Sequence, residues 1–439
     1  MANRNRIAKA GRYQPVHRIE VYVWDRFVGA VALDPALGYY VFAYDKDFAR
    51  SGIQLSPLQM PVDSSERLYV FTDIPEETFR RLPAMLADAL PDEFGNALID
   101  KYMAEKGIPK SDITALDRLA YMGKRAMGAL EFKPTRGPRA AKPAALEMNQ
   151  LVAAARKAIS GALEGDFAAD AALRSILSVG TSANGARAKA VIAWNRTTGE
   201  IRSGQFELLA GFEHWLLKFD GMGKDLELGT SQDYGRIEYA YYLMAREAGI
   251  NMRESRLLEE NGRAHFMTRR FDREDDGAKH HLQSLCAMAH IDFKKKSANS
   301  YEQLFMTIRE MKLGRSAEVE AFRRMAFNVM GRNCDDHSKN FSFLLREGGS
   351  WELAPAYDIT FAYNPKAEWT NRHLMSVNGN YDEIGREDCC VLADRFGIGE
   401  ASSILKEVRG AIEQWPDFAK QAGVQSTEIR RIQEHIRLL

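Results

Sequence analysis

The chain has 439 residues, which is enough for two or three domains with buried cores. Lys plus Arg and Asp plus Glu each number 60, so the formal net charge at neutral pH is zero. This balance argues against a protein that binds nucleic acid through a strong overall field, although it allows a local basic patch. Four cysteines without a C-x-x-C pair are too few for a disulfide scaffold and do not suggest zinc.

The sequence also lacks the usual marks of export or membrane insertion. No apolar run approaches the about 18 residues that a membrane span needs. The basic N-terminal stretch MANRNRIAKAGR is not followed by an apolar segment, so no signal peptide is expected. Together with the cysteine usage, this predicts a cytoplasmic protein in a reducing compartment.

The first part of the chain combines strand and helix patterns. Alternating apolar residues within 19–44 predict three strands, with a hairpin around Asp25-Arg26. A helical pattern takes over within 76–103, where Pro83 is expected near a helix start or kink. A further short helix and a strand are expected within 113–123 and 128–134.

A linker is expected at 133–146, which is rich in Pro, Ala and basic residues and contains no acid. It would end a first domain at 1–140. The following segment, 141–275, runs a small-residue loop into a strand and then contains a long helix at 235–250, which stops at Gly249. The residues of this helix available for burial are Ile237, Tyr241, Leu243, Met244 and Ala248.

The remaining segment, 276–439, is expected to be mostly helical. A helix within 317–334 ends in a polar stretch, NCDDHSKN, and 340–360 then predicts a hairpin about a Glu-Gly-Gly-Ser turn. The apolar face of that helix contains Val319, Phe322, Ala326, Val329 and Met330. The tail is helical within 400–415 and 426–439.

The polar stretch has the spacing of a phosphoryl-transfer loop. Asp335 and Asn340 are five residues apart, and Asp358 stands beyond the expected hairpin. Phosphoryl transfer needs one carboxylate to orient the attacking hydroxyl, and an amide oxygen with a second carboxylate to hold Mg²⁺. Protein kinases use the same Asp-x-x-x-x-Asn order before their metal-binding Asp.

Two other interpretations of this stretch remain open. Asp and Asn side chains commonly cap backbone groups in a polar turn without any further role. A transition metal would use His337 with Asp335 or Asp336, although no second histidine lies nearby. The hairpin followed by Asp358 favours phosphoryl transfer over both.

Two lysines upstream are candidates for binding phosphate. The loop TSANGARAK supplies small residues for close backbone approach and ends in Lys189, but it is neither a Walker A motif nor G-x-G-x-x-G. Lys218 lies in the apolar strand WLLKF, where it is either an exposed edge residue or part of a buried ion pair. Glu238 on the next helix is a candidate partner.

These motifs, taken together and in this order, resemble the HipA family of toxin kinases. The matching stretches are SANGARAKAVI, WLLKF, EYAYYLMAREAGI, FMTRRFDR, CDDHSKNFSF and LAPAYDI. VGAVALDPALGYYVFAY and ALPDEFGNALI also resemble the family's first segment. The resemblance implies an α+β, two-lobed protein-kinase-like fold with an extra N-terminal β-rich segment and a mostly helical C-terminal lobe.

The resemblance also implies a role for individual residues of a Ser/Thr protein kinase that uses ATP and Mg²⁺. Asp335 would be the catalytic base, Asn340 and Asp358 would hold the metal, and Ser182 would be phosphorylated by the kinase itself. The residues that would contact nucleotide are Asn184, Gly185, Ala186, Arg187, Ala188, Lys189, Lys218, Arg269, Arg270, Phe271, His337, Ser338, Lys339, Asn340, Tyr357 and Asp358.

The chain departs from the family pattern at three places. Arg269 stands where the family's hinge strand, expected beside adenine, carries glutamate. Arg187-Ala188 replace Gln-Glu in the phosphate loop, and Asp336 replaces the glycine that follows the catalytic aspartate. Family members pair with a small helix-turn-helix antitoxin that binds operator DNA, and an aminoacyl-tRNA synthetase is a known type of substrate. A small-molecule kinase of the aminoglycoside type and a non-catalytic corepressor scaffold are the alternative functions.

Overall fold

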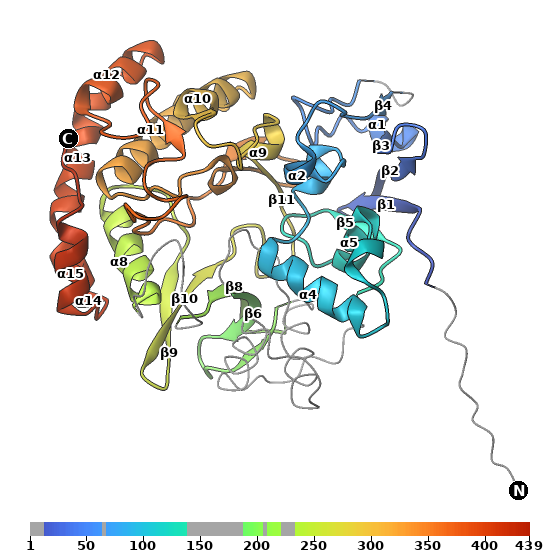
Figure 1. Ribbon diagram of the computed structural model, residues 1–439, viewed down its shortest axis with the longest axis horizontal. Coiled ribbons are helices and arrows are strands. Elements are labelled where there is room, and N and C mark those ends of the chain that lie inside the picture. Colours follow the sequence, from blue (N-terminus) through green and yellow to red (C-terminus); the bar gives the residue numbers. More distant parts are fainter. Residues whose placement is uncertain (1–12, 64–66, 138–187, 205–208, 221–232) are drawn as a thin grey trace, which may run out of the picture.

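The computed structural model describes residues 13–63, 67–137, 188–204, 209–220 and 233–439 (Figure 1). Three parts follow one another along the chain: an N-terminal α/β domain, a five-stranded antiparallel sheet with one long helix, and a largely helical lobe. Figure 1 shows the N-terminal domain lying beside both of the others. Among the described helices, none has the length and hydropathy required to cross a bilayer.

The N-terminal domain is built on an antiparallel sheet of order β4-β3-β2-β1-β5. The strands are β1 (Arg18–Val23), β2 (Arg26–Asp34), β3 (Tyr39–Tyr44), β4 (Leu68–Tyr69) and β5 (Glu131–Lys133). The predicted three strands are confirmed, and the hairpin turns at Trp24 and Asp25, whose positive φ angles of 47° and 57° suit a two-residue connection.

The helical pattern predicted within 76–103 is divided into three helices, and the short helix expected within 113–123 is confirmed as α5 (Ala115–Met122). The helices of this domain are α1 (Lys46–Arg50), α2 (Glu76–Phe79), α3 (Ala84–Ala87), α4 (Glu93–Ala104) and α5, with a 3₁₀ turn at Lys110–Asp112. The region 76–103 is interrupted because Arg80 and Arg81 adopt left-handed backbone conformations, with φ of 52° and 61°. Pro83 then caps the start of α3, as expected.

The second sheet has the order β7-β6-β8-β10-β9. Its strands are β6 (Lys189–Asn195), β7 (Ile201–Ser203), β8 (Phe212–Lys218), β9 (Ser255–Glu260) and β10 (Arg263–Arg269). Helix α8 (Tyr234–Glu247) packs against β9 and β10. Gly235 permits this approach, since a Cβ atom there would lie 2.0 Å from the carbonyl oxygen of Ala264.

The helical lobe holds two small sheets at its inner side. Its helices are α9 (Leu285–Met288), α10 (Tyr301–Glu310), α11 (Arg315–Met330), α12 (Arg386–Arg395), α13 (Ala401–Glu413), α14 (Trp415–Gln421) and α15 (Ser426–Gln433). The strands are β11 (His281–Ser284), β12 (Asn299–Ser300), β13 (Ser342–Leu345), β14 (Trp351–Leu353) and β15 (Met375–Ser376). The predicted hairpin is confirmed as β13 and β14, in which Phe343 pairs with Leu353.

The N-terminal domain shares its apolar core with the second sheet. Buried side chains of its own strands form one cluster with Trp215, Leu217 and Met267 of β8 and β10. The helical lobe has a separate core centred on α8, α10, α11 and α13. The N-terminal domain is therefore packed as one body with the sheet beside it.

Asp272 joins the N-terminal domain to the segment after β10. The Asp272 carboxylate is fully buried and accepts hydrogen bonds from Arg270 Nε at 2.9 Å, Arg273 Nη1 at 3.0 Å and the backbone N–H of Gly128 at 2.7 Å. Burial alone would raise the pKa of Asp272, but the two guanidinium groups hold it well below its usual range. Arg273 also donates to the carbonyl oxygens of Ala126 and Gly128.

Removing the Asp272 charge should therefore be far more destabilising than removing an exposed charge nearby. We expect Asp272→Asn to lower the free energy of unfolding by about 3–5 kcal/mol, because two buried guanidinium groups lose their charged partner. The matched control is Asp275→Asn, since Asp275 pairs with Arg269 on the surface and should contribute only about 0–1 kcal/mol. Urea unfolding measures both, and equal losses would contradict the role given to Asp272.

Candidate functional site

Lys218 lies at the end of β8 and is buried between two carboxylates. Its ammonium group donates to Glu238 of α8 and to Asp358, which follows the β13–β14 hairpin. Burial works to lower the pKa of Lys218, but Asp358 and Glu238 together raise it above the ordinary value. The lysine is therefore charged, and of the two expectations for it the buried ion pair with Glu238 is confirmed.

Lys189 lies directly beside Lys218, because β6 and β8 pair these residues in register. Lys189 is also buried, and burial lowers its pKa against the opposing effect of Asp358 and Asp92. The two lysines hold the pKa of Asp358 at about 2, although burial would raise it. Two lysines thus lie beside an ionised carboxylate in a buried place, which suits the oxygens of a phosphate chain.

Contacts to both lobes hold Asp358 in place. Ala356 donates its N–H to Asn251 at 2.8 Å, just beyond α8, and the Tyr357 hydroxyl donates to the carbonyl oxygen of Lys339 at 2.7 Å. Asp358 itself has a φ of 53°, a left-handed conformation that Asp tolerates better than most residues. These contacts set the carboxylate against Lys218.

The polar loop brings its two ends together. Asn340 donates its side-chain N–H to the carbonyl oxygen of Asp335 at 2.7 Å, and Asn340 and Asp358 line the same small cavity. The Asp335 carboxylate is partly exposed and accepts a hydrogen bond from Trp369 Nε1 at 3.1 Å. Burial of the shielded part of the carboxylate raises the pKa of Asp335, and the nearby His337 opposes this rise.

Asp336 has a structural position that the sequence did not reveal. Its carboxylate is buried and accepts from Tyr301 Oη at 2.8 Å, His373 Nδ1 at 2.9 Å and the N–H of Leu374 at 2.8 Å. These hydrogen bonds engage the Asp336 carboxylate, one of the two acidic groups that a transition-metal site with His337 could use. Within the described residues no group of three or more His, Cys, Asp and Glu side chains is arranged for a metal ion.

Two buried apolar side chains lie next to the two lysines. Val191 and Leu216 are each two residues from a lysine, so strand alternation places them on the same face, and they form a small buried cluster of their own. The ring of Phe271 lies 5.7 Å from that of Tyr357. This arrangement suits an aromatic base attached to a phosphate chain.

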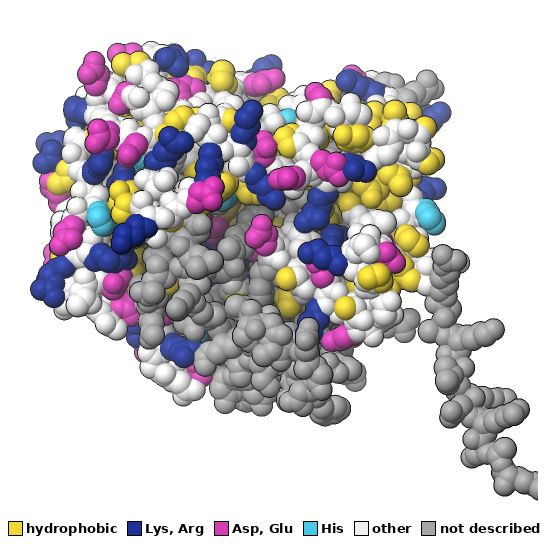
Figure 2. Space-filling view, viewed as in Figure 1, with side chains coloured by type: hydrophobic (Ala, Val, Ile, Leu, Met, Phe, Trp, Pro, Cys, Tyr) yellow, Lys and Arg dark blue, Asp and Glu magenta, His cyan; other side chains and the backbone are white. Residues whose placement is uncertain are grey.

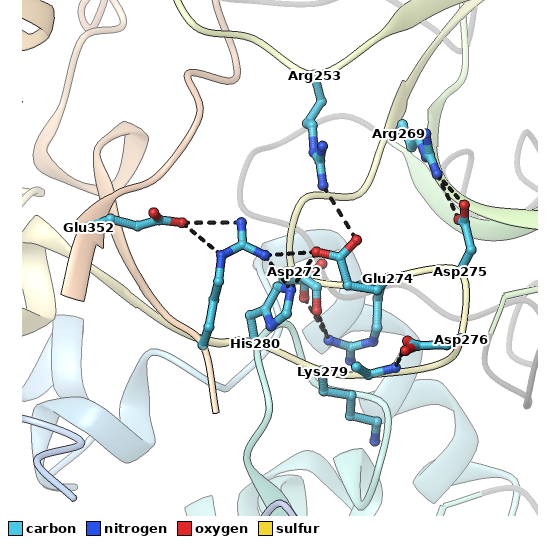
Figure 3. A network of polar contacts seen from close by, with 12 residues as sticks. Arg253, Arg269, Asp272, Glu274, Asp275, Asp276, Lys279, His280 and Glu352 are labelled. Carbon is cyan, nitrogen blue, oxygen red and sulfur yellow. Dashed lines mark hydrogen bonds and ion pairs between the residues drawn. The ribbon is translucent and has the colours of Figure 1, made fainter. Parts of the chain in front are cut away.

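The arginines at the end of β10 have side chains bound to acidic residues. Figure 3 shows Arg269 pointing to Asp275, and the buried Arg270 is held by Asp272. The backbone N–H of Arg270 donates to His214 at 2.9 Å. A cavity of about 890 Å³ adjoins this segment, and Val191, His214 and Arg270 line it together with Lys124 of the N-terminal domain. The side chains of Arg269 and Arg270 are therefore engaged in ion pairs, and their contact with a nucleotide stays a prediction.

The other candidate residues are found in varied settings. Ala188 is buried and accepts from the N–H of Phe219, Ser338 is buried, and Lys339 lies over the ring of Phe293. His337 packs against Phe293 and lies 3.6 Å from Asp335. The candidates Ser182, Asn184, Gly185, Ala186 and Arg187 lie outside the described residues.

Sequence reasoning missed two contributors to the site. Trp369 donates to the candidate base from the segment after Asp358, and Asp92 reaches Lys189 from the N-terminal domain. The only sign of Asp92 in the sequence was a helix-start pattern before a helical run. Its distance from Lys189 along the chain hid the contact.

The sheet with its paired lysine and glutamate, set beside a helical lobe with an Asp-x-x-x-x-Asn loop, defines a two-lobed, kinase-like fold with an added N-terminal domain. Family models match two parts of the chain: a HipA N-terminal domain at 19–133 and a HipA-like C-terminal domain at 181–437. The chain belongs to the HipA family.

Individual proteins are similar to this chain in structure or in sequence. A HipA chain from Shewanella oneidensis MR-1, solved with HipB and its operator DNA, is 16% identical with a TM-score of 0.64, covering 95% of this chain and 94% of that one. A putative kinase of Haemophilus influenzae is 29% identical over 206 residues, which are 40% of this chain and 60% of that protein. Putative kinase Y4mE of Sinorhizobium fredii is 24% identical over 197 residues, 43% of this chain and 41% of its own length. The chain thus matches less than two thirds of each of these two relatives.

The pair of His373 and Asp336 gives a prediction about stability. Burial lowers the pKa of His373, but Cys334 and Asp336 raise it by more, to about 10. Because this value lies above the about 6.5 of an unfolded histidine, the protonated ring stabilises the fold fully below that pH and the stabilisation fades as the pH rises toward 10.

We therefore expect the free energy of unfolding lost in His373→Asn to be greatest in mildly acidic solution and to shrink in alkaline solution. Urea unfolding across this range measures it, with the exposed His17→Asn as control. A loss that stayed constant with pH would show that His373 is not charged in the folded protein.

Proposed function

We propose that this chain is an ATP- and Mg²⁺-dependent serine/threonine protein kinase, the toxin of a toxin-antitoxin pair. The observation that carries this proposal is the buried Lys218, which is paired at once with Glu238 of α8 and with Asp358. A buried ion pair is weak evidence for stability, so its presence beside a polar loop with kinase spacing favours a functional reason. Asp335, Asn340 and Asp358 are all present, which supports a kinase over a non-catalytic scaffold.

The roles follow from the positions of the groups. Lys189 and Lys218 would bind the phosphate chain, and Val191 and Leu216 would cover the base. The Asn340 amide oxygen and the Asp358 carboxylate are hard oxygen ligands that would hold Mg²⁺, which neutralises phosphate charge when bound. Asp335 would orient the attacking hydroxyl and accept its proton, and Trp369 would leave one of its oxygens available for this.

A direct assay of transfer tests the proposal. We expect the purified protein, incubated with Mg-ATP, to place phosphate on Ser182, as mapped by mass spectrometry. Asp335→Asn and Asp358→Asn should each reduce transfer by roughly 100-fold or more, because they remove the base and a charged metal ligand. The matched control, Asp394→Asn on the surface of α12, should leave the rate unchanged.

The outcomes separate the candidate functions. Near-full transfer by either folded site variant would contradict the role given to that residue. Transfer to aminoglycosides, with none to the protein itself or to an aminoacyl-tRNA synthetase, would replace the protein kinase with a small-molecule kinase. Absence of transfer to all of these would favour the corepressor scaffold.

The proposal includes a DNA-binding partner. The visible surface in Figure 2 intersperses Lys and Arg with Asp and Glu, in keeping with the zero net charge. DNA affinity rests mainly on phosphate contacts from basic groups. The visible face and the charge balance therefore fit a chain that reaches operator DNA through a small helix-turn-helix antitoxin, like the HipB present in the Shewanella complex.

We expect such an antitoxin, encoded beside this chain, to co-purify with it on co-expression and the pair to bind the operator. Fluorescence anisotropy with labelled operator DNA compares the pair with the isolated chain. Tight and salt-sensitive binding by the isolated chain would contradict this division of labour.

A further inference from the structure

A short segment of the N-terminal domain, residues 88–92, connects the two lobes across the candidate site. Asp88 accepts hydrogen bonds from Ser284, at 2.6 Å from its backbone N–H and 2.8 Å from its hydroxyl, and Ser284 caps α9 in the helical lobe. Four residues on, Asp92 faces Lys189 of the other lobe, with Oδ2 lying 4.0 Å from Nζ. One segment therefore contacts both lobes.

The pair of Asp92 and Lys189 is almost completely shielded from water. The side chains of Lys189 and Asp92 are only 4% and 6% exposed. Asp92 also interacts electrostatically with Lys339 and Asp358, so its carboxylate lies among the groups proposed to bind phosphate and metal. Burial raises the pKa of Asp92 to about 6 despite the nearby lysines, which means that an ionised carboxylate is unfavourable at this position.

Helix capping involves only one of the two oxygens of the Asp92 carboxylate. Oδ1 accepts the backbone N–H of Gly95 at 2.7 Å at the start of α4, and Asn or Ser would cap the helix as well. Capping therefore does not require the charge that Oδ2 presents to Lys189. The carboxylate partners of Lys218 come from other parts of the chain than the N-terminal domain. Glu238 lies on α8, the helix that packs on the second sheet, and Asp358 lies in the helical lobe.

We propose that Asp92 belongs to the nucleotide site. Its carboxylate contacts Lys189 at the position that phosphate oxygens take when a nucleotide binds. This inference rests on the proposed function. A phosphate chain entering the site must displace Asp92 from Lys189 and also meets its negative charge. The N-terminal domain thereby sets the affinity for the phosphate part of the nucleotide and leaves the base part unaffected.

Comparison of two ligands tests this role. The variant Asp92→Asn keeps the cap of α4 and removes the charge, and Asp92→Ser is a second neutral cap in case the first variant folds poorly. In calorimetric titrations with Mg-ATP we expect the Kd to fall about three- to tenfold, the range for losing one charge contact. Adenosine, which lacks phosphate, should bind with unchanged affinity. The control Asp112→Asn, at an exposed position in the same domain, should alter neither titration.

Each other result would overturn the inference. Unchanged or weaker Mg-ATP binding in both variants, while the wild type binds Mg-ATP, would remove Asp92 from the phosphate site and leave the proposed kinase intact. Equal tightening of adenosine and Mg-ATP would mean that Asp92 controls the opening of the lobes and does not compete with phosphate. Failure of the wild type to bind either ligand would refute the nucleotide site itself.

Discussion

The charged lysine buried at the end of β8 requires carboxylate partners, and this requirement fixes how the parts of the molecule pack together. Lys218 meets it with Glu238 from α8 and Asp358 from beyond the β13–β14 hairpin. An isolated buried ammonium group would be strongly unfavourable, and removing one partner of such a pair typically costs about 3–5 kcal/mol. The pairing thus fixes α8 against its sheet, where Gly235 allows the close approach, and fixes the helical lobe against both.

The N-terminal domain takes part in the same arrangement. Its apolar core continues into β8 and β10, and Asp272 ties its loop at Gly128 to the segment after β10. Asp88 reaches the helical lobe, and Asp92 reaches Lys189. The candidate site is therefore bounded by three parts of the chain, so nucleotide affinity and domain packing are physically coupled through buried charges.

Local patterns in the sequence were enough for most of the elements. Alternation of apolar residues predicted β1 to β3, and helical periodicity predicted α8 and α11. Burial of one face of an element produces a regular spacing of apolar residues within a short stretch of sequence. The breaks within 76–103 depended on left-handed conformations at Arg80 and Arg81, for which neither residue has a preference. The burial of Lys218 and the contacts of Asp92 and Asp336 depended on partners far along the chain, which a single sequence does not reveal.

The most direct test of the account is a structure of the protein with Mg²⁺ and a non-hydrolysable ATP analogue. The account predicts the phosphate chain against Lys189 and Lys218, the base beside Val191 and Leu216, and the metal between Asn340 and Asp358. Asp335 should remain open toward the terminal phosphate. Nucleotide bound elsewhere, with Lys218 still held only by Glu238 and Asp358, would contradict it.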